Sequence, residues 1–110
     1  MVEVVVTHEF RGWYEPLTEE EQEAVTRVVT LLAQEGVALG HPYSSAINGA
    51  AFALRELRVQ HQGRPYRVFY AFDASRQAVL LIGGDKTSRD RFYEEMIPQA
   101  EAIWREYLEE

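Results

Sequence analysis

Three strand-like segments in the second half of the chain are separated by turns of only about three residues. The segments read ALRELRVQH, PYRVFYAFD and QAVLLIGGD, and the turns between them are QGR and ASR. Turns this short can join only neighbouring antiparallel strands, because a parallel crossover needs a dozen or more residues. The sequence therefore predicts an antiparallel meander near residues 53–60, 65–73 and 77–84. The third segment is apolar on both faces, which indicates a central strand.

The first half of the chain predicts a helix with a well-defined start. Thr18 and Glu21 have the spacing of an N-terminal capping box, and apolar residues then recur every three or four positions up to Leu32. We expect this helix to end at Gly36, since glycine commonly closes helices. The preceding segment, HEFRGWYEP at residues 8–16, reads as a brief helical turn or loop.

The remaining segments complete an α+β fold. Residues 2–7 are a short β-branched run, which predicts a strand at an edge of the sheet. Residues 36–52 read as a long connection, and residues 88–110 as a helix that Pro98 bends or interrupts. The expected order is β-α-(α)-β-β-β-α, an antiparallel sheet with helices packed on it.

Composition excludes several classes of protein. Cysteine is absent, and the three histidines lie far apart, at His8, His41 and His61, so we expect neither a metal nor another cofactor. The N-terminal sequence MVEVVVTHEF has no basic region and no long apolar run, which argues against a signal peptide or a membrane span. We expect one domain over residues 1–110, in the cytoplasm and without a membrane partner.

The formal net charge of −7 is distributed unevenly, and the chain divides into three parts of different charge. Residues 1–53 hold two arginines against eight carboxylates, and residues 94–110 hold one arginine against six. Residues 54–93, which include the predicted meander, hold eight cations against four carboxylates. A basic middle between acidic ends favours one positive surface for an anionic partner, although arginines that simply decorate strands would give the same count.

Strand alternation predicts which cations can meet. If the first two meander strands align, Arg58 and Arg67 project from one face, and Lys86 follows the third strand after the glycine pair at 83–84, which reads as flexible. Tyr93 lies at the start of the last helix. Two guanidinium groups, an ammonium group and a phenol suit a phosphodiester, because arginine binds phosphate oxygens in pairs and cations stabilise charge that grows in the transition state.

The motifs of this region resemble the RelE/ParE toxin superfamily, and within it the phage-related HigB-type toxins of bacterial type II toxin–antitoxin modules. The similar elements are LRELR, YRVFYAFD, RQAVLLIGGDK and FYEEMIP, which occur in order between Leu54 and Pro98. The resemblance implies a RelE-like fold and a metal-independent endoribonuclease that cleaves mRNA, usually on the ribosome. It also implies a cognate helix-turn-helix antitoxin, with operator DNA bound only through the antitoxin complex.

The resemblance also assigns roles to residues. Arg67 matches the arginine that binds the scissile phosphate, and Arg58 matches a basic residue of the preceding strand. Lys86 matches the basic position after the last strand, and Tyr93 an aromatic residue that stacks on a base or assists proton transfer. Four neighbouring side chains are expected to contact RNA: Arg55, His61, Arg89 and Arg91. For two of them a simpler interpretation exists, since a lone histidine such as His61 is more often inert and Arg55 reads as a solvated edge residue.

This chain departs from the pattern of the toxin family in two ways, which leave two alternative functions open. The chain is acidic, whereas family members that act on ribosomes are usually basic, and no side chain is evidently placed as a general base. A ParE-like inhibitor of DNA gyrase and a catalytically silent relative that only binds its antitoxin are the alternatives. Arg67 is expected to lie exposed on its strand, so that its replacement by alanine would not unfold the protein.

Overall fold

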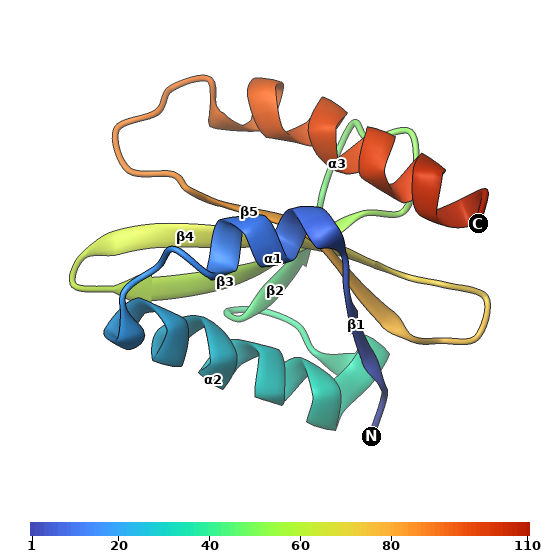
Figure 1. Ribbon diagram of the computed structural model, residues 1–110, viewed down its shortest axis with the longest axis horizontal. Coiled ribbons are helices and arrows are strands. Elements are labelled where there is room, and N and C mark those ends of the chain that lie inside the picture. Colours follow the sequence, from blue (N-terminus) through green and yellow to red (C-terminus); the bar gives the residue numbers. More distant parts are fainter.

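A five-stranded sheet in the order β1-β5-β4-β3-β2 organises the computed structural model, which describes residues 1–110 (Figure 1). Helices cover both of its faces. The elements follow the predicted order with one additional short strand: β1 (Val4–Val6), α1 (His8–Tyr14), α2 (Glu19–Glu35), a single 3-10 turn (Gly36–Ala38), β2 (Ser44–Ala46), β3 (Arg55–His61), β4 (Arg64–Phe72), β5 (Ala78–Asp85) and α3 (Phe92–Leu108).

The predicted meander is confirmed, and the two edges of the sheet add to it. Strands β3, β4 and β5 pair antiparallel in sequence order. Strand β1 lies at one edge, as expected, but it runs parallel to β5, so the sheet is mixed rather than purely antiparallel. At the other edge, β2 pairs antiparallel with the first residues of β3. This strand lies inside the segment that was expected to be a connection.

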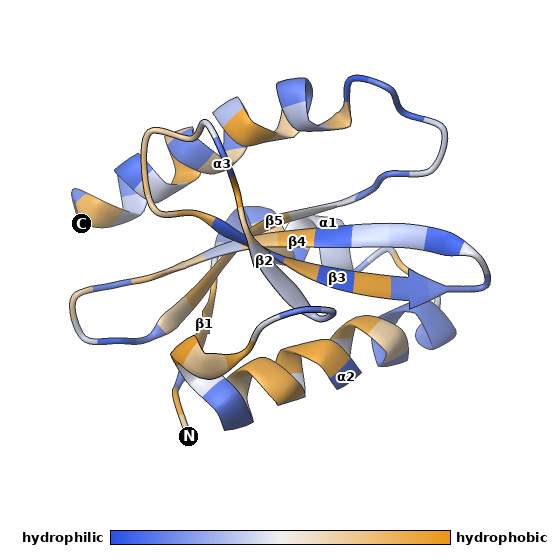
Figure 2. Cartoon of the chain, turned by 180° about the vertical axis from the view of Figure 1, so that it is seen from behind, coloured by the Kyte–Doolittle hydropathy of each residue, from blue (hydrophilic) through white to orange (hydrophobic).

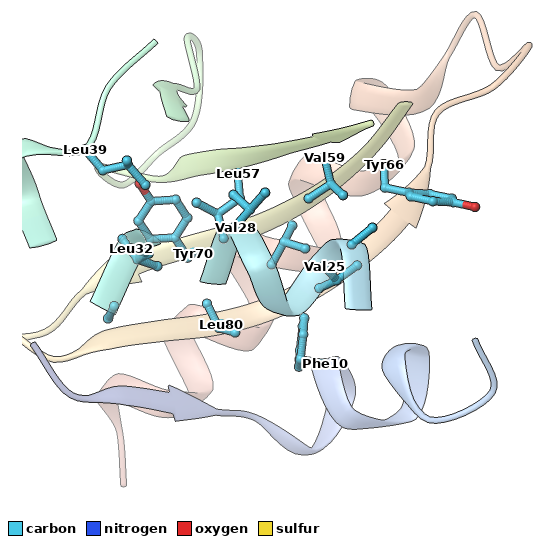
Figure 3. Packing of buried hydrophobic residues seen from close by; sticks show 13 residues of the cluster. Phe10, Val25, Val28, Leu32, Leu39, Leu57, Val59, Tyr66, Tyr70 and Leu80 are labelled. Carbon is cyan, nitrogen blue, oxygen red and sulfur yellow. The ribbon is translucent and has the colours of Figure 1, made fainter. Parts of the chain in front are cut away.

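The alternation of each central strand divides the core into two layers. On one face, Val25, Val28 and Leu32 of α2 and Phe10 of α1 pack against the strands, as Figure 3 shows. On the other face, α3 contributes a buried stripe, which packs on side chains of β4 and β5: Phe92, Met96, Ala100 and Trp104. Figure 2 shows hydrophobic and hydrophilic residues alternating along β3, as a strand between unlike surroundings requires.

The start of α2 is fixed by its cap and by the sheet. The Thr18 hydroxyl accepts from the Glu21 N–H (3.2 Å), and the Glu21 carboxylate accepts from the Thr18 N–H (2.8 Å), which confirms the predicted capping box. Glu21 also accepts a hydrogen bond from the Tyr66 hydroxyl and pairs with Arg64 of β4 (3.3 Å). Burial, and then the hydrogen bond to Glu21, raises the pKa of Tyr66 to about 12, so this phenol remains a hydrogen-bond donor at neutral pH.

A β-bulge in β5 changes which side chains face α3 at the end of the sheet where the basic residues lie. Phe69 lies opposite Ile82 and Tyr70 opposite Leu80, so one residue of β5 has no partner and the faces of the strand exchange there. Gly83 then faces Trp13 of α1, and Gly84 faces Phe92 of α3. Both glycines are buried within the strand. The expectation of a flexible glycine pair is therefore wrong, because aromatic rings pack directly on this backbone.

The Gly83→Ala variant is expected to lower the free energy of unfolding by about 1–3 kcal/mol, the usual cost of overpacking a core. A methyl group at this position would overlap the rigid indole ring of Trp13. Thermal denaturation of the variant and the parent measures the difference. The Gly12→Ala variant is a suitable control, because nothing lies within 4 Å of a methyl group there. Equal melting temperatures for Gly83→Ala and the parent would show that Trp13 does not pack on this strand.

Candidate active site

Arg58 and Arg67 lie directly opposite each other on β3 and β4, as alternation predicts. They project from the face of the sheet on which α3 packs farther along the strands. They lie toward the end of the molecule that carries both the β3–β4 turn and the β5–α3 loop (Figure 1). The Lys86 N–H donates to the Pro65 carbonyl (2.8 Å), which fixes the start of that loop beside β4. Arg58 and Arg67 also line a common surface groove of about 480 Å³.

Arg67 is buried, with only 5% of its surface exposed, so the expectation of an exposed arginine is wrong. Its Nη1 donates to the Tyr66 carbonyl (3.0 Å), and its Nε lies 3.5 Å from Glu56 Oε1. That Nε is buried but has no hydrogen-bond partner, because the contact with Glu56 is an ion pair without hydrogen-bond geometry. The arginine is thus held in place while part of its donor capacity remains unused.

Glu56 is the residue at the centre of the site that the sequence interpretation missed. Its carboxylate is buried and accepts from the Tyr93 hydroxyl at Oε1 (2.7 Å) and from the Ser45 hydroxyl at Oε2 (3.0 Å). Together with Arg67, these contacts join β2, β3, β4 and the first turn of α3 in one polar cluster. A signal existed, since Glu56 and Arg58 are two residues apart on one strand and therefore share a face.

Tyr93 and Lys86 complete the cluster from the α3 side. Burial, and then the hydrogen bond to Glu56, raises the pKa of the Tyr93 hydroxyl, and Arg67 opposes this in part. Like an ordinary tyrosine, the phenol is protonated at neutral pH, and it donates a hydrogen bond to Glu56. The Lys86 ammonium group lies 5.5 Å from the centre of the Tyr93 ring, within the range of a cation–π contact. No carboxylate pairs with Lys86 or Arg58, so both remain available to a ligand.

The four residues that were predicted to be catalytic therefore lie in one continuous cluster. Arg58 neighbours Arg67, Arg67 contacts Glu56, Glu56 binds Tyr93, and Tyr93 contacts Lys86. The cluster combines three cations, which can bind a phosphate group, with a carboxylate and a phenol, which can accept and donate a proton. Three or more histidine, aspartate or glutamate side chains grouped to hold a metal ion do not occur in the structure.

Two of the four expected RNA-contacting residues lie on the other face of the sheet. The Arg55 Nε donates to the Ser44 and Tyr70 hydroxyls (3.2 and 3.3 Å), on the face of the sheet that α2 covers. His61 shares the side of β3 that carries Leu57 and Val59, near the β3–β4 turn. Arg55 and Arg58 are three positions apart, and an odd separation within a strand places side chains on opposite faces.

The other two expected RNA contacts, Arg89 and Arg91, follow Lys86 but are paired with α3. Arg89 bonds to Glu95, and Arg91 lies 3.0 Å from Glu94. Arg64 and Arg67 are paired as well, so four of the eight cations in residues 54–93 contact carboxylates. The positive character of the region is therefore concentrated on fewer free groups than the sequence suggests.

Comparison with known proteins identifies the family. Residues 13–105 match the family described as "Phage derived protein Gp49-like (DUF891)". The chain is 36% identical over 100 residues to "Putative toxin HigB3" of Mycobacterium tuberculosis (strain ATCC 25618 / H37Rv), which covers 89% of this chain and 86% of that protein. It is also 36% identical over 100 residues to "Putative toxin HigB2" of the same strain, with 88% of this chain and 50% of that protein covered.

The chain belongs to the Gp49-like phage-derived family, within the RelE/HigB-type toxins. The resemblance that the motifs LRELR and YRVFYAFD predicted is thus confirmed, and so is the α+β fold. This chain spans about half the length of the second relative. None of the helices has both the length and the apolar character needed to cross a membrane.

Proposed function

We propose that this chain is the toxin of a bacterial type II toxin–antitoxin module and that it inhibits translation by cleaving mRNA. The observation that carries the proposal is the cluster in which Arg67 is held by Glu56, beside Tyr93 and the unpaired Arg58 and Lys86. Such a cluster suits phosphodiester chemistry, since its cations can bind the phosphate and its carboxylate and phenol can handle protons. The names of the two mycobacterial relatives support the toxin assignment.

In the proposed reaction the ribose 2′-oxygen attacks the adjacent phosphorus and the bond to the 5′-oxygen breaks. Arg58, Arg67 and Lys86 stabilise the negative charge that grows on the phosphate oxygens. The proton of the 2′-hydroxyl passes to Glu56, and the 5′-oxygen takes a proton from Tyr93, whose raised pKa keeps the phenol protonated. The products are a 2′,3′-cyclic phosphate and a 5′-hydroxyl end, and no step requires a metal ion.

The proposed partners are mRNA on the ribosome and a helix-turn-helix antitoxin. The antitoxin is proposed to bind at or beside the basic cluster through an acidic or amphipathic segment, because Arg58 and Lys86 have no internal counter-charge. Operator DNA is proposed to be bound only through the antitoxin complex. The protein is proposed to act in the cytoplasm, where mRNA is translated.

One observation favours a second candidate, a catalytically silent toxin relative that only binds its antitoxin. Arg67 already pairs with a buried carboxylate, and a phosphate would have to compete with Glu56 for the guanidinium group. A net charge of −7 also weakens general attraction to RNA. Under this alternative, expression of the chain would leave transcripts intact.

Induction of the chain in a bacterial host, followed by mapping of transcript 5′ ends, tests the two candidates against each other. The proposed function predicts arrested growth and new 5′ ends within coding regions soon after induction. An inactive variant, Arg58→Ala together with Lys86→Ala, serves as the control for the burden of expression. Arrest without new transcript ends would contradict mRNA cleavage and would favour a protein target such as DNA gyrase. The absence of both effects would favour the silent relative.

A further inference from the structure

The groove that Arg58 and Arg67 share extends around the free edge of β3 to α2. Strand β2 pairs only with Arg55, Glu56 and Leu57, so the rest of β3 has no neighbouring strand on that side. Beyond this point the groove is lined by α2 and by the loop before β2. Its polar and aromatic lining includes Arg27, His41, Tyr43, Arg58, Gln60 and Arg67. We call it the β3-edge groove.

The charge of the β3-edge groove is unusual for this chain. None of its 11 lining residues is an aspartate or a glutamate, although the chain holds 18 carboxylates. Four other surface pockets each include at least one carboxylate, for example Glu9 and Asp85 in one and Glu106 in another. Arg27 is one of only two arginines in residues 1–53, and it forms no ion pair. The groove is therefore cationic on an otherwise acidic surface.

Tyr43 adds an aromatic surface beside these cations. The residue is 44% exposed, and its carbonyl accepts a hydrogen bond from the Arg58 N–H (2.8 Å). That bond fixes the backbone of the loop at the edge of β3, and the Tyr43 and Arg58 side chains line the same groove. Exposed aromatic rings beside backbone-binding cations are the usual elements of single-stranded nucleic acid recognition.

We propose that the β3-edge groove binds the nucleotide next to the scissile phosphate, with its phosphate between Arg27 and Arg58 and its base against Tyr43. The inference rests on the proposed function, because it extends the path of the RNA from the Arg67 cluster. It adds α2 and the loop before β2 to the RNA-binding surface. The groove contributes affinity and base preference, whereas the Arg67 cluster contributes the chemistry.

Binding of a non-cleavable probe separates this inference from catalysis. The probe is a short single-stranded RNA with 2′-O-methyl groups throughout, and binding is measured by fluorescence anisotropy at several salt concentrations. The Arg27→Gln variant is compared with Arg11→Gln, which removes the other arginine of residues 1–53 from a helical position that is also exposed. Tyr43→Ala tests the base contact. Melting curves of all variants verify that they are folded.

Arg27→Gln is expected to weaken binding and to lower the slope of log affinity against log salt by about 0.7, as the loss of one phosphate contact does on a single strand. Tyr43→Ala is expected to weaken binding about 5- to 150-fold with little change in slope, as the loss of one stacked base does. Arg11→Gln should match the parent. Cleavage by Arg27→Gln should show a raised KM at nearly unchanged kcat.

Two results would overturn the inference, and they differ in what they imply for the proposed function. If the parent binds and cleaves RNA while Arg27→Gln and Arg11→Gln behave alike, the groove is not a nucleotide subsite and the proposed function stands. If the parent neither binds the probe nor cleaves mRNA on translating ribosomes, both proposals are wrong.

Discussion

The Arg67→Ala variant is expected to cleave RNA about 100- to 1,000-fold more slowly than the parent. Arg67 is held rigidly by β4 and by Glu56, at the centre of the cluster that contains the proposed phosphate-binding groups. Removal of one such preorganised electrostatic contact typically costs this factor in kcat. Single-turnover cleavage of ribosome-bound mRNA, with the toxin in excess, measures the chemical step directly.

Stability must be measured in the same experiment because Arg67 is buried. Its removal leaves the Glu56 carboxylate without its cation, a change that typically costs about 3–5 kcal/mol in a buried pair. Ser45 and Tyr93 continue to donate to this carboxylate, so we expect the lower end of that range. Arg67→Lys is the matched control, since it keeps the charge but not the two-point grip of a guanidinium group. A folded Arg67→Lys protein that cleaves at the parental rate would refute the role of Arg67.

The Glu56→Gln variant is expected to lower the cleavage rate by about 100- to 10,000-fold, the usual contribution of a positioned acid–base group. Glutamine keeps the size of the side chain and can still accept from Ser45 or Tyr93. It cannot, however, take up a proton or pair with Arg67. Removal of the carboxylate also removes one of the causes that raise the pKa of Tyr93, so that pKa should fall, although burial remains its largest cause.

Glu95→Gln is the matched control for this variant. Glu95 also pairs with an arginine, Arg89, but it is exposed on α3 and lies outside the cluster. We expect its cleavage rate to stay within about twofold of the parent, because exposed ion pairs contribute little. If Glu56→Gln were folded and as active as Glu95→Gln, Glu56 would have only a structural role.

The central part of the fold could be predicted because local rules determine it. Short turns force β3, β4 and β5 to be antiparallel neighbours, and the capping box with its apolar stripe defines α2. Strand β2 could not be predicted, since three residues of sequence Ser-Ser-Ala have no periodicity and become a strand only through pairing with β3. The parallel pairing of β1 likewise depends on a partner more than 70 residues away.

In the site as well, features that depend on local sequence could be predicted, and features that depend on distant residues could not. Alternation correctly placed Arg58 and Arg67 together, because both positions belong to one regular hairpin. The burial of Glu56 depends on α3, which brings Tyr93 over β3 from 37 positions farther along the chain. A charged residue in a strand reads as solvated when this packing is unknown. The same cause buries Arg67, and it explains why its exposure was overestimated.

The chemical nature of the cleaved ends tests the central claim most directly. Purified protein is incubated with an mRNA substrate and translating ribosomes, and the 5′ ends of the downstream fragments are analysed for hydroxyl or phosphate groups. Attack by the 2′-hydroxyl predicts 5′-hydroxyl ends and 2′,3′-cyclic phosphates from the parent, and far fewer such fragments from Arg67→Lys under the same conditions. Fragments with 5′-phosphate ends, or equal amounts of fragments from both proteins, would contradict cleavage by the Arg67 cluster.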